Sequence, residues 1–589
     1  MITVNNINDT SGAGLIPIVI GVTGHRDLRD GDREQLAEKV RQIFVEIHKQ
    51  CPHSPIVLLS PLAEGADRLA AKVALESPLQ TAPDFRVQFI VPLPMAAEEY
   101  EKDFQTPESR AEFREVLQRA DSHFSLPSVA GNTPENIGRP EHRDRQYEQV
   151  GAYIAHHSQI LIALWDGDET EKVGGTSKIV QFKLKGIPEP YVRRRKHLDL
   201  VDSGPVYHVV TPRISNPNPR MEQFTVRKYY PETVSHEEAF EVTFSNILRK
   251  IDDYNRDIGS LSGSLAAEIK KNGAFAIPDE KTTSLPSSVQ KLLHHYAVAD
   301  TLALHFQRKS NLTLGGILVL VVLAVFCLQL YLEFFKNQYM LLSYPLLLGA
   351  AYWWYKKTKD GDVQNKHLDY RAIAEGLRVQ IFWNMIALNE NVSEHYLRKQ
   401  RSEMDWIRFA IRSCSLPMCN SKKCEDEKNN DDIGYAYSLT EKHWVADQRN
   451  YFVKATERES AELTKRESHT QALYLSGLGI VMSMIVLHNV LHEFKFVHSV
   501  LIVSIGSLLA MAAAVQGYIE KRAFAEQEKQ YARMRDMFAH ASRHFSEAIQ
   551  SKDFDKAREI VLDLGKEALA ENGDWVLLHR AKPINVPKG

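Results

Sequence analysis

Cysteine is scarce in this sequence, and neither sign of charge predominates. Only 5 of the 589 residues are cysteine, and 72 Lys and Arg residues stand against 75 Asp and Glu residues, which leaves a formal net charge of −3. An odd, sparse set of cysteines argues against a disulfide-rich secreted protein and indicates a reducing compartment. Because there is no basic excess, no nucleic acid partner is expected.

The first residues also lack the features of a targeting segment. MITVNNINDTSGAG has no basic region followed by an apolar run, so no cleavable signal peptide is expected, and residues 1–14 are predicted to be disordered. The mean hydropathy of −0.31 is low for a chain with long apolar runs. This contrast predicts a soluble protein with a membrane insert, not a polytopic transporter.

Four apolar stretches have the length of a membrane span: 312–334, 339–355, 470–491 and 497–519. At a rise of about 1.5 Å per residue, a helix of roughly 20 residues covers the hydrocarbon core of a bilayer. The short links FKNQ and HEFKF join the stretches into two hairpins, and the aromatic run 352–355 is typical of a membrane interface. The sequence therefore predicts an all-α membrane region with four transmembrane helices in two hairpins.

Basic residues are concentrated on one side of the spans. They precede the first and third spans and follow the second and fourth, as Arg308, Lys309, Lys356, Lys357, Lys465, Arg466, Lys521 and Arg522. The turns between spans hold only Lys336 and Lys495. The positive-inside rule predicts a multi-pass protein of the cell (inner) membrane. Its two termini and its soluble domain are expected to lie in the cytoplasm.

Charged residues are also rare within the spans. The main polar intrusions are Gln329, Glu333, His488 and Gln516, most of them near span ends. A transporter or proton relay would need ionisable groups inside the membrane, whereas an anchor or an oligomeric pore would not. Glycines such as those at 315–316 and 477–479 allow close helix approach, which is compatible with assembly. The polar helices that leave the membrane, 363–400 and 522–550, are expected to expose their charges to solvent.

The N-terminal part alternates strand and helix patterns. Apolar strand patterns occur at 17–24, 55–60, 86–92, 158–165 and 205–211, with helical periodicity between them. This alternation predicts a Rossmann-like, doubly wound α/β domain over residues 15–260. A linker is predicted at 261–287.

Glycine-containing turns follow three of these strands, where ligands bind in such sheets. The candidate ligand-binding residues are Gly21, Thr23, Gly24, His25, Arg26, Glu64, Gly65, Ala66, Asp67, Asp166, Gly174, Gly175 and Thr176. Glycines let backbone amides approach a phosphate, Arg26 would pair with it, and Glu64 or Asp67 would accept a bond from a ribose hydroxyl. The pattern predicts a site for a phosphorylated ligand.

At these residues the sequence resembles a known superfamily. GVTGHRDL (21–28), SPLAEGADRLAA (60–71), ILIALWDG (160–167) and GGT (174–176) are similar to SLOG domains, Rossmann-like relatives of DprA and LOG proteins. The membrane part resembles SLATT modules, in two copies at 288–412 and 440–580 separated by a polar linker at 413–439. LDYRAIAEGLRVQIFW (368–383) and LGKEALAENGDWVLLHR (564–580) carry this second resemblance.

The resemblance implies a function. SLOG domains are inferred to sense nucleotide derivatives, and SLATT modules are inferred pore formers of bacterial antiphage and conflict defence. The chain is therefore expected to bind a nucleotide-derived ligand and no other cofactor. Its other expected partners are the lipid bilayer and further copies of itself, in a homo-oligomer.

One motif departs from the enzymes of this superfamily. LOG-type phosphoribohydrolases carry PGGxGTxxE, whereas this chain reads VGGTSKIV at 173–180, without a carboxylate. A hydrolase needs such a group, so its absence favours binding without turnover and no catalytic residue is assigned. Glu64 or Asp67 could take the place of the missing carboxylate, so a membrane-anchored phosphoribohydrolase is one alternative function. A passive membrane scaffold for a partner enzyme is the other. Cys414, Cys419 and Cys424 have no standard zinc spacing, so no metal is expected.

Overall fold

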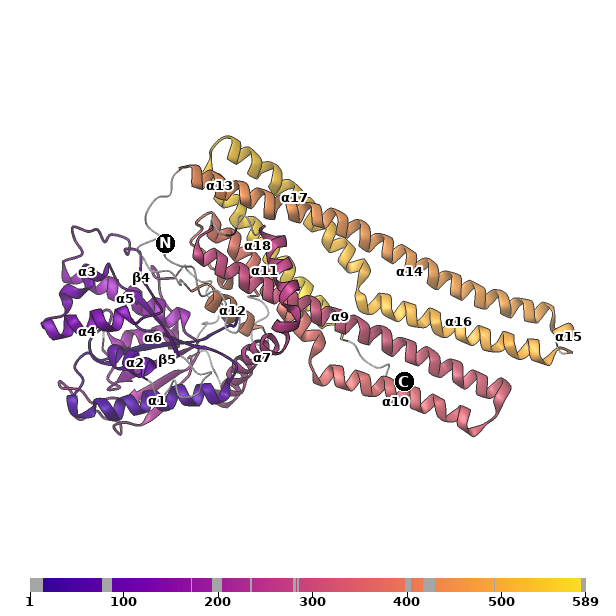
Figure 1. Ribbon diagram of the computed structural model, residues 1–589, viewed down its shortest axis with the longest axis horizontal. Helices are drawn as coiled ribbons and strands as arrows, with labels where there is room; N and C mark the ends of the chain where they lie inside the picture. The colour runs from indigo at the N-terminus through magenta and orange to yellow at the C-terminus, as the bar shows by residue number, and fades with distance from the viewer. Residues whose placement is uncertain are drawn as a thin grey trace.

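The computed structural model describes residues 14–76, 87–170, 172–192, 204–232, 236–278, 282, 285–397, 404–416, 430–491 and 493–583. The segment predicted to be disordered lies outside the described residues except for Gly14, and so do Cys419 and Cys424. Figure 1 shows an α/β domain at one end of the molecule and two long helical hairpins that project from the other end.

A seven-stranded sheet forms the N-terminal domain, in the order β4-β3-β2-β1-β5-β6-β7. The strands are β1 (Ile18–Gly24), β2 (Ile56–Leu59), β3 (Val87–Leu93), β4 (Ser122–Ser125), β5 (Ile160–Trp165), β6 (Val206–Val210) and β7 (Val226–Tyr229). Every neighbouring pair is parallel except β6 with β7. The predicted Rossmann-like, largely parallel sheet is confirmed, and the short edge strands β4 and β7 are additions to the five predicted strands.

Helices cover both faces of this sheet because successive strand side chains point to opposite faces. Ile18 and Ile20 of β1 belong to the core that includes α1 (Arg33–Gln50) and α2 (Ala66–Leu75). Val19, between them, belongs to a second core with α5 (Pro140–His157) and α6 (Thr176–Lys185). The sheet is thus buried on both faces, and loops lie at the edge where the carboxyl ends of the parallel strands meet.

The C-terminal region is helical. Its main helices are α7 (Glu237–Ala276), α9 (Ser287–Leu330), α10 (Gln338–Asp360), α11 (Val363–Met385), α12 (Asp405–Cys414), α13 (Asn430–Thr440), α14 (Asp447–Val486), α16 (Lys495–Arg522), α17 (Phe524–Gln550) and α18 (Phe554–Arg580). Helix α7 continues past residue 260, where the sequence predicts the end of the α/β domain. Helices α9 with α10, and α14 with α16, form the two projecting hairpins (Figure 1).

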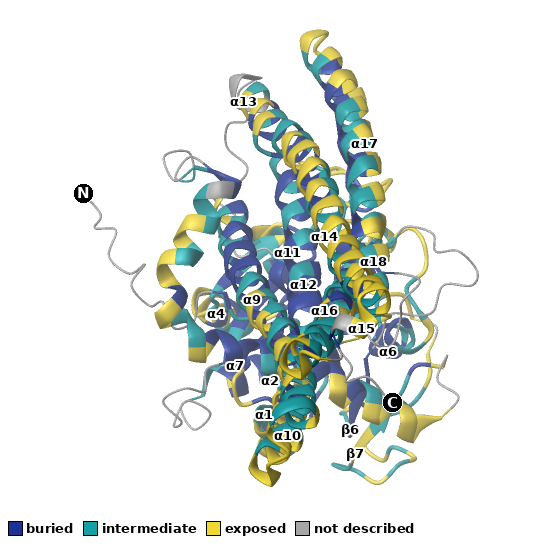
Figure 2. Ribbon diagram, turned by 90° about the vertical axis from the view of Figure 1, so that its right-hand side faces the viewer, coloured by how far each residue is buried: buried dark blue, intermediate teal, exposed yellow. Residues whose placement is uncertain are grey.

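Three helical stretches are long and apolar enough to cross a membrane, and they are Ser287–Phe335, Gly434–Val486 and Lys495–Gln550. Such stretches indicate a membrane protein. The remaining predicted span, 339–355, lies in α10, whose tyrosines and tryptophans make it less apolar. Large apolar side chains on these hairpins are uncovered, with Leu312 70% exposed and Val486 77% exposed. The outer faces of α10 and α14 are largely exposed in Figure 2. Lipid would remove this apolar surface from water.

Helix α11 does not have the solvated charges that its sequence predicts. It ends at Met385, and 15 of its 23 residues are buried. Asp369 is 3% exposed, and its carboxylate accepts a hydrogen bond from Trp406 Nε1 (3.2 Å) and pairs with Lys250 Nζ (3.5 Å) and with Arg580. One carboxylate therefore connects α11 to α12, α7 and α18.

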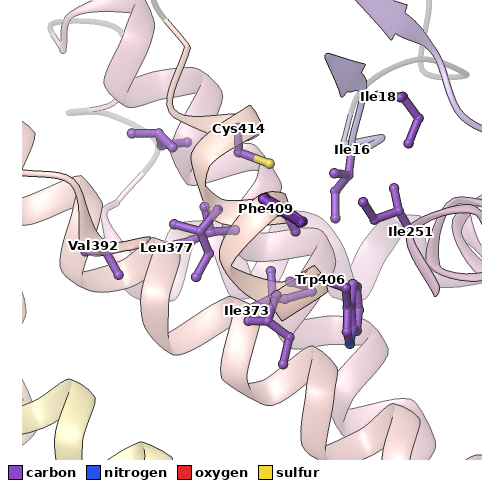
Figure 3. Close-up of a cluster of buried hydrophobic side chains, with 14 of the residues drawn as sticks. Ile16, Ile18, Ile251, Ile373, Leu377, Val392, Trp406, Phe409 and Cys414 are labelled. Atoms are coloured by element: carbon purple, nitrogen blue, oxygen red, sulfur yellow. The ribbon is translucent and has the colours of Figure 1, made fainter. Parts of the chain in front are cut away.

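The α/β domain and the helical region share one continuous core. Figure 3 shows Ile16, just before β1, and Ile251 of α7 on the side of α12 that carries Trp406 and Phe409, and all four side chains are buried in the same apolar cluster. Asn255 of α7 adds a polar connection, because its side chain exchanges two 2.8 Å hydrogen bonds with the backbone of Ile16. The two regions are therefore packed together and not merely tethered.

We expect the substitution Asp369→Asn to destabilise the protein. It leaves the cations of Lys250 and Arg580 beside a neutral group, and breaking a buried ion pair costs about 3–5 kcal/mol. The thermal unfolding midpoint in detergent should fall clearly. Asp536→Asn is the matched control, because Asp536 is an exposed partner of Arg535 on α17, and its midpoint should stay unchanged. Equal midpoints for both variants would contradict the role of Asp369.

Candidate functional site

The carboxyl edge of the sheet gathers the predicted site residues. The strand order reverses between β1 and β5, which are neighbours in the sheet, and ligands of doubly wound folds bind at this switch point. The turns after β1, β2 and β5 all end at this edge. The three sequence motifs therefore lie on adjacent loops, as the topology requires.

The turn after β1 is tightly enclosed. A side chain at Gly24 would place a Cβ atom 2.3 Å from Cβ of Ala66, and one at Gly65 would lie 2.4 Å from the carbonyl oxygen of His25. Gly65 also has a φ of +80°, which other residues rarely adopt. The amide of Ala66 donates to the His25 carbonyl oxygen (3.0 Å), so the β1 turn and the start of α2 form one unit.

Asp166, directly after β5, is a buried hub and not a free ligand contact. Its Oδ2 atom accepts hydrogen bonds from Arg213 Nε (2.8 Å) and Asn216 Nδ2 (3.1 Å), and its Oδ1 atom accepts one from the Asp168 amide (3.2 Å). Burial acts to raise the pKa of Asp166, but the bond from Asn216 and the nearby His25 outweigh it and lower the pKa. Asp166 thus stays ionised and fixes the loop after β6 against β5.

His25 completes this hub. Its Nε2 atom lies 3.1 Å from Asp166 Oδ1 and 3.2 Å from the Asp166 amide nitrogen. Burial lowers the pKa of His25, although the charge of Asp166 opposes the shift. The neutral ring accepts from the amide, and the protonated ring would donate to the carboxylate. His25 is therefore a neutral side chain at pH 7 that positions the turn.

Arg26 is the exposed cation of the site. Its guanidinium lies 5.2 Å from the ring centroid of Tyr147 on α5, and it forms no ion pair among the described residues. The Tyr147 hydroxyl donates to Asp103, which also accepts from Arg143 Nε at 2.7 Å. Gly174 reaches the same place, because a Cβ there would lie 3.1 Å from Tyr147 Cβ. Arg26 is thus held on an aromatic ring with its charge available to an anion.

Asp67 is the most unusual acid of the site. It is 5% exposed, and its Oδ1 atom has no hydrogen-bond partner within the described part of the chain. Burial raises the pKa of Asp67 to about 7, against the opposing charge of Arg26. Glu64 differs, because its carboxylate accepts from the Ser109 hydroxyl. A buried carboxyl group with a raised pKa is typical of functional sites.

The other predicted residues have structural positions. Gly21 lies within β1, where a Cβ would be 2.6 Å from Ile154 on α5, so it serves helix packing. Gly175 precedes α6, and Thr176 is its buried first residue. Thr23 is the partner of Ala163 in the β1–β5 ladder. Tyr147 and Asp103 were not predicted, because α5 and the turn Glu101–Asp103 reach the site only through the tertiary fold.

A groove of about 880 Å³ runs from Arg26 along α2. Its charged lining residues are Glu34, Glu64, Glu76, Glu108, Glu112 and Glu115 with Arg26, Arg33, Arg68 and Lys72. Arg68 and Lys72 are both paired with Glu112. The acids outnumber the bases, so a phosphate is favoured only at the Arg26 end.

The described residues contain no cluster of three or more His, Cys, Asp or Glu side chains suited to a metal ion. Neither a protein-family model nor a curated protein matches this chain, so a functional assignment depends on the residues and their geometry.

The raised pKa of Asp67 predicts a pH dependence of stability. Between the unfolded carboxyl pKa of about 3.9 and the folded value of about 7, the unfolded chain loses this proton first. Stability is therefore lost as the pH rises through this window. We expect Asp67→Asn to reduce the fall in unfolding midpoint between pH 5.5 and pH 8. Glu64→Gln is the control; a pH profile of Asp67→Asn identical to that of the unmodified protein would contradict the prediction.

Proposed function

We propose that this protein is a membrane-embedded effector whose α/β domain senses a nucleotide-derived ligand and whose helical hairpins perturb or permeabilise the membrane in response. The resemblance to SLOG and SLATT domains supports this function and a role in antiphage or conflict defence. The observation that carries the proposal is helix α5, which contacts both the candidate site and the helical region.

The two ends of α5 face different parts of the protein. Tyr147, in its first half, lies under Arg26 and beside Gly174. At its carboxyl end the His156 carbonyl oxygen accepts from Arg412 Nη1 on α12 (3.2 Å), and His156 Nε2 lies 3.1 Å from Glu394 Oε1. The helix is about 27 Å long. A ligand that moves Tyr147 would therefore move the contact with α12.

A second contact runs parallel to α5. Gln159, just after this helix, donates through Nε2 to the Ser413 hydroxyl on α12 (2.7 Å). Its Oε1 atom accepts from the Val19 amide of β1. Helix α12 packs against α11, and α11 packs against α9, which continues into the apolar stretch. A contiguous series of packed elements thus connects the sheet to the first hairpin.

The two hairpins contact each other along α9 and α16. The Ser507 hydroxyl bonds to Gln329 Oε1 (3.1 Å), and the Ser499 hydroxyl donates to Glu333 Oε2 (2.8 Å). Polar side chains at membrane depth need such partners. With α10 as a fourth span, the two hairpins make one four-helix unit, and its polar seam lies between α9 and α16. Opening along this seam is how the unit, alone or in a homo-oligomer, would let ions pass.

Asp67 favours one alternative, a nucleotide phosphoribohydrolase. A carboxyl group with a pKa of about 7 is suited to general acid catalysis. The segment VGGTSKIV still lacks the carboxylate that LOG-type enzymes carry. Incubation with nucleoside monophosphates and chromatography for free base separates the two functions, and released base that is lost in Asp67→Asn would establish the enzyme.

Arg26 should be needed for the response to ligand. We expect purified protein in liposomes to release a trapped dye when nucleoside phosphates or cyclic nucleotides are added. The substitution Arg26→Ala should weaken ligand binding about tenfold or more, because a charge-assisted bond is lost. Arg33→Ala is the matched control, since Arg33 lies in the same groove but is paired with Asp30. Equal responses of both variants, or no release with any nucleotide, would contradict the proposal.

Gln159 should be needed for coupling but not for binding. Gln159→Met removes the bonds to Ser413 and to the Val19 amide and keeps the side-chain length. We expect unchanged nucleotide affinity by calorimetry and a several-fold smaller dye release. Gln527→Met, at a buried glutamine of α17 outside this route, is the control. A loss of affinity in Gln159→Met that equals its loss of release would show that the residue serves the binding site.

A further inference from the structure

A separate cavity, partly open to solvent, lies in the helical region near the bases of the two hairpins. Its volume is about 160 Å³, and its lining comes from α9, α11, α14, α17 and α18 together with Trp444, just before α14. Gln307 of α9 and Gln448 of α14 line it near the bases of the two hairpins. The α/β domain contributes no lining residue.

The charged residues that line this cavity balance one another. Arg371 pairs with Glu375 (2.6 Å), Arg378 pairs with the same carboxylate, and Glu571 pairs with Arg533 outside the lining (3.4 Å). Burial lowers the pKa of His367 to about 3, so its ring is uncharged at pH 7. Two positive and two negative side chains thus face the cavity, which disfavours a ligand with a net charge.

Two buried polar atoms of the lining lack partners. Arg378 Nε, a donor, and Gln530 Oε1, an acceptor, have no hydrogen-bond partner among the described residues. The orientation of the Gln530 amide is fixed by its nitrogen atom, because Nε2 donates to the Glu571 carbonyl oxygen (3.0 Å). Unsatisfied buried groups are costly, so an occupant with both an acceptor and a donor would be stabilised here.

Aromatic rings make up much of the remaining wall: Trp444, Tyr451, Phe452, Tyr531, Phe538 and Trp575. Several are in contact, with ring centroids of Phe452 and Tyr531 5.7 Å apart and those of Trp444 and Phe538 6.3 Å apart. Such rings favour a flat, polarisable occupant. A cavity of about 150 Å³ admits benzene, and drug-sized ligands need about 300 Å³ or more. The space therefore holds one ring system, and the ribose phosphate of a nucleotide would have to lie outside it.

We propose that this cavity is a binding site for an uncharged planar heteroaromatic molecule of the nucleobase class. Its ring would pack among the aromatic side chains while its polar edge pairs with Arg378 and Gln530. Because the walls belong to both hairpins, an occupant would stabilise the arrangement in which their bases are joined. This site is separate from the nucleotide site proposed on the α/β domain.

Adenine, cytosine and uracil are the probes, tested on the full chain in detergent by calorimetry and by the unfolding midpoint. At least one should bind with a Kd below about 1 mM and raise the midpoint. Ala568→Met, which fills the cavity, should weaken binding at least tenfold, and so should Gln530→Leu, which removes the acceptor. Ala570→Met, exposed on the same helix, should leave binding unchanged.

The same measurements in an Arg26→Ala background keep the two sites apart. There the bases should bind as before, whereas adenosine monophosphate should bind at least tenfold more weakly than it binds the unmodified protein, because its site on the α/β domain has lost the cation. Absence of base binding, equal binding by Ala568→Met, or equally tight binding of the monophosphate would overturn the proposal. The first result would mean that the cavity holds water only.

Discussion

One buried carboxylate, Asp369, is the interaction on which the assembly of the helical region depends. It lies on α11 and engages Lys250 of α7, Trp406 of α12 and Arg580 of α18. These helices belong to the part next to the sheet and to both of the predicted SLATT-like modules. An ionised group in such a position requires all its partners at once, since each missing partner leaves a desolvated charge. Asp369 therefore fixes the positions of α7, α11, α12 and α18 relative to one another.

The sequence predicted the sheet better than the helices around it. Apolar runs such as 158–165 are recognisable because both faces of a parallel strand are buried. The strands β4 and β7 are short edges with polar residues, so they carry no such signal. Helix α11 reads as polar and is nevertheless buried, since its Asp369 and Arg371 find ion partners on other helices. Only the tertiary fold supplies those partners.

In the candidate site, too, local features could be predicted from the sequence and tertiary contacts could not. Turn residues Gly24, Gly65 and Arg26 could be placed at the carboxyl edge of the sheet from the sequence because strand–turn–helix chemistry is local. Asp166 was predicted as a ligand contact, yet its oxygens are occupied by Arg213 and Asn216 from a later loop. Tyr147 supports Arg26 from a helix that no local motif connects to it. Spacing along the chain identifies the edge of the sheet, and packing decides which groups there remain available.

Helix α9 has no proline across its 44 residues, which pass the cavity at Gln307 and continue to the far end of the first hairpin. A continuous helix of this length is about 66 Å long and bends little. Its base packs against α11, and its far end contacts α10 and α16. A tilt of a few degrees at the base becomes a displacement of several ångströms at the far end. Small changes among the side chains at the base of the first hairpin are thereby magnified at its far end.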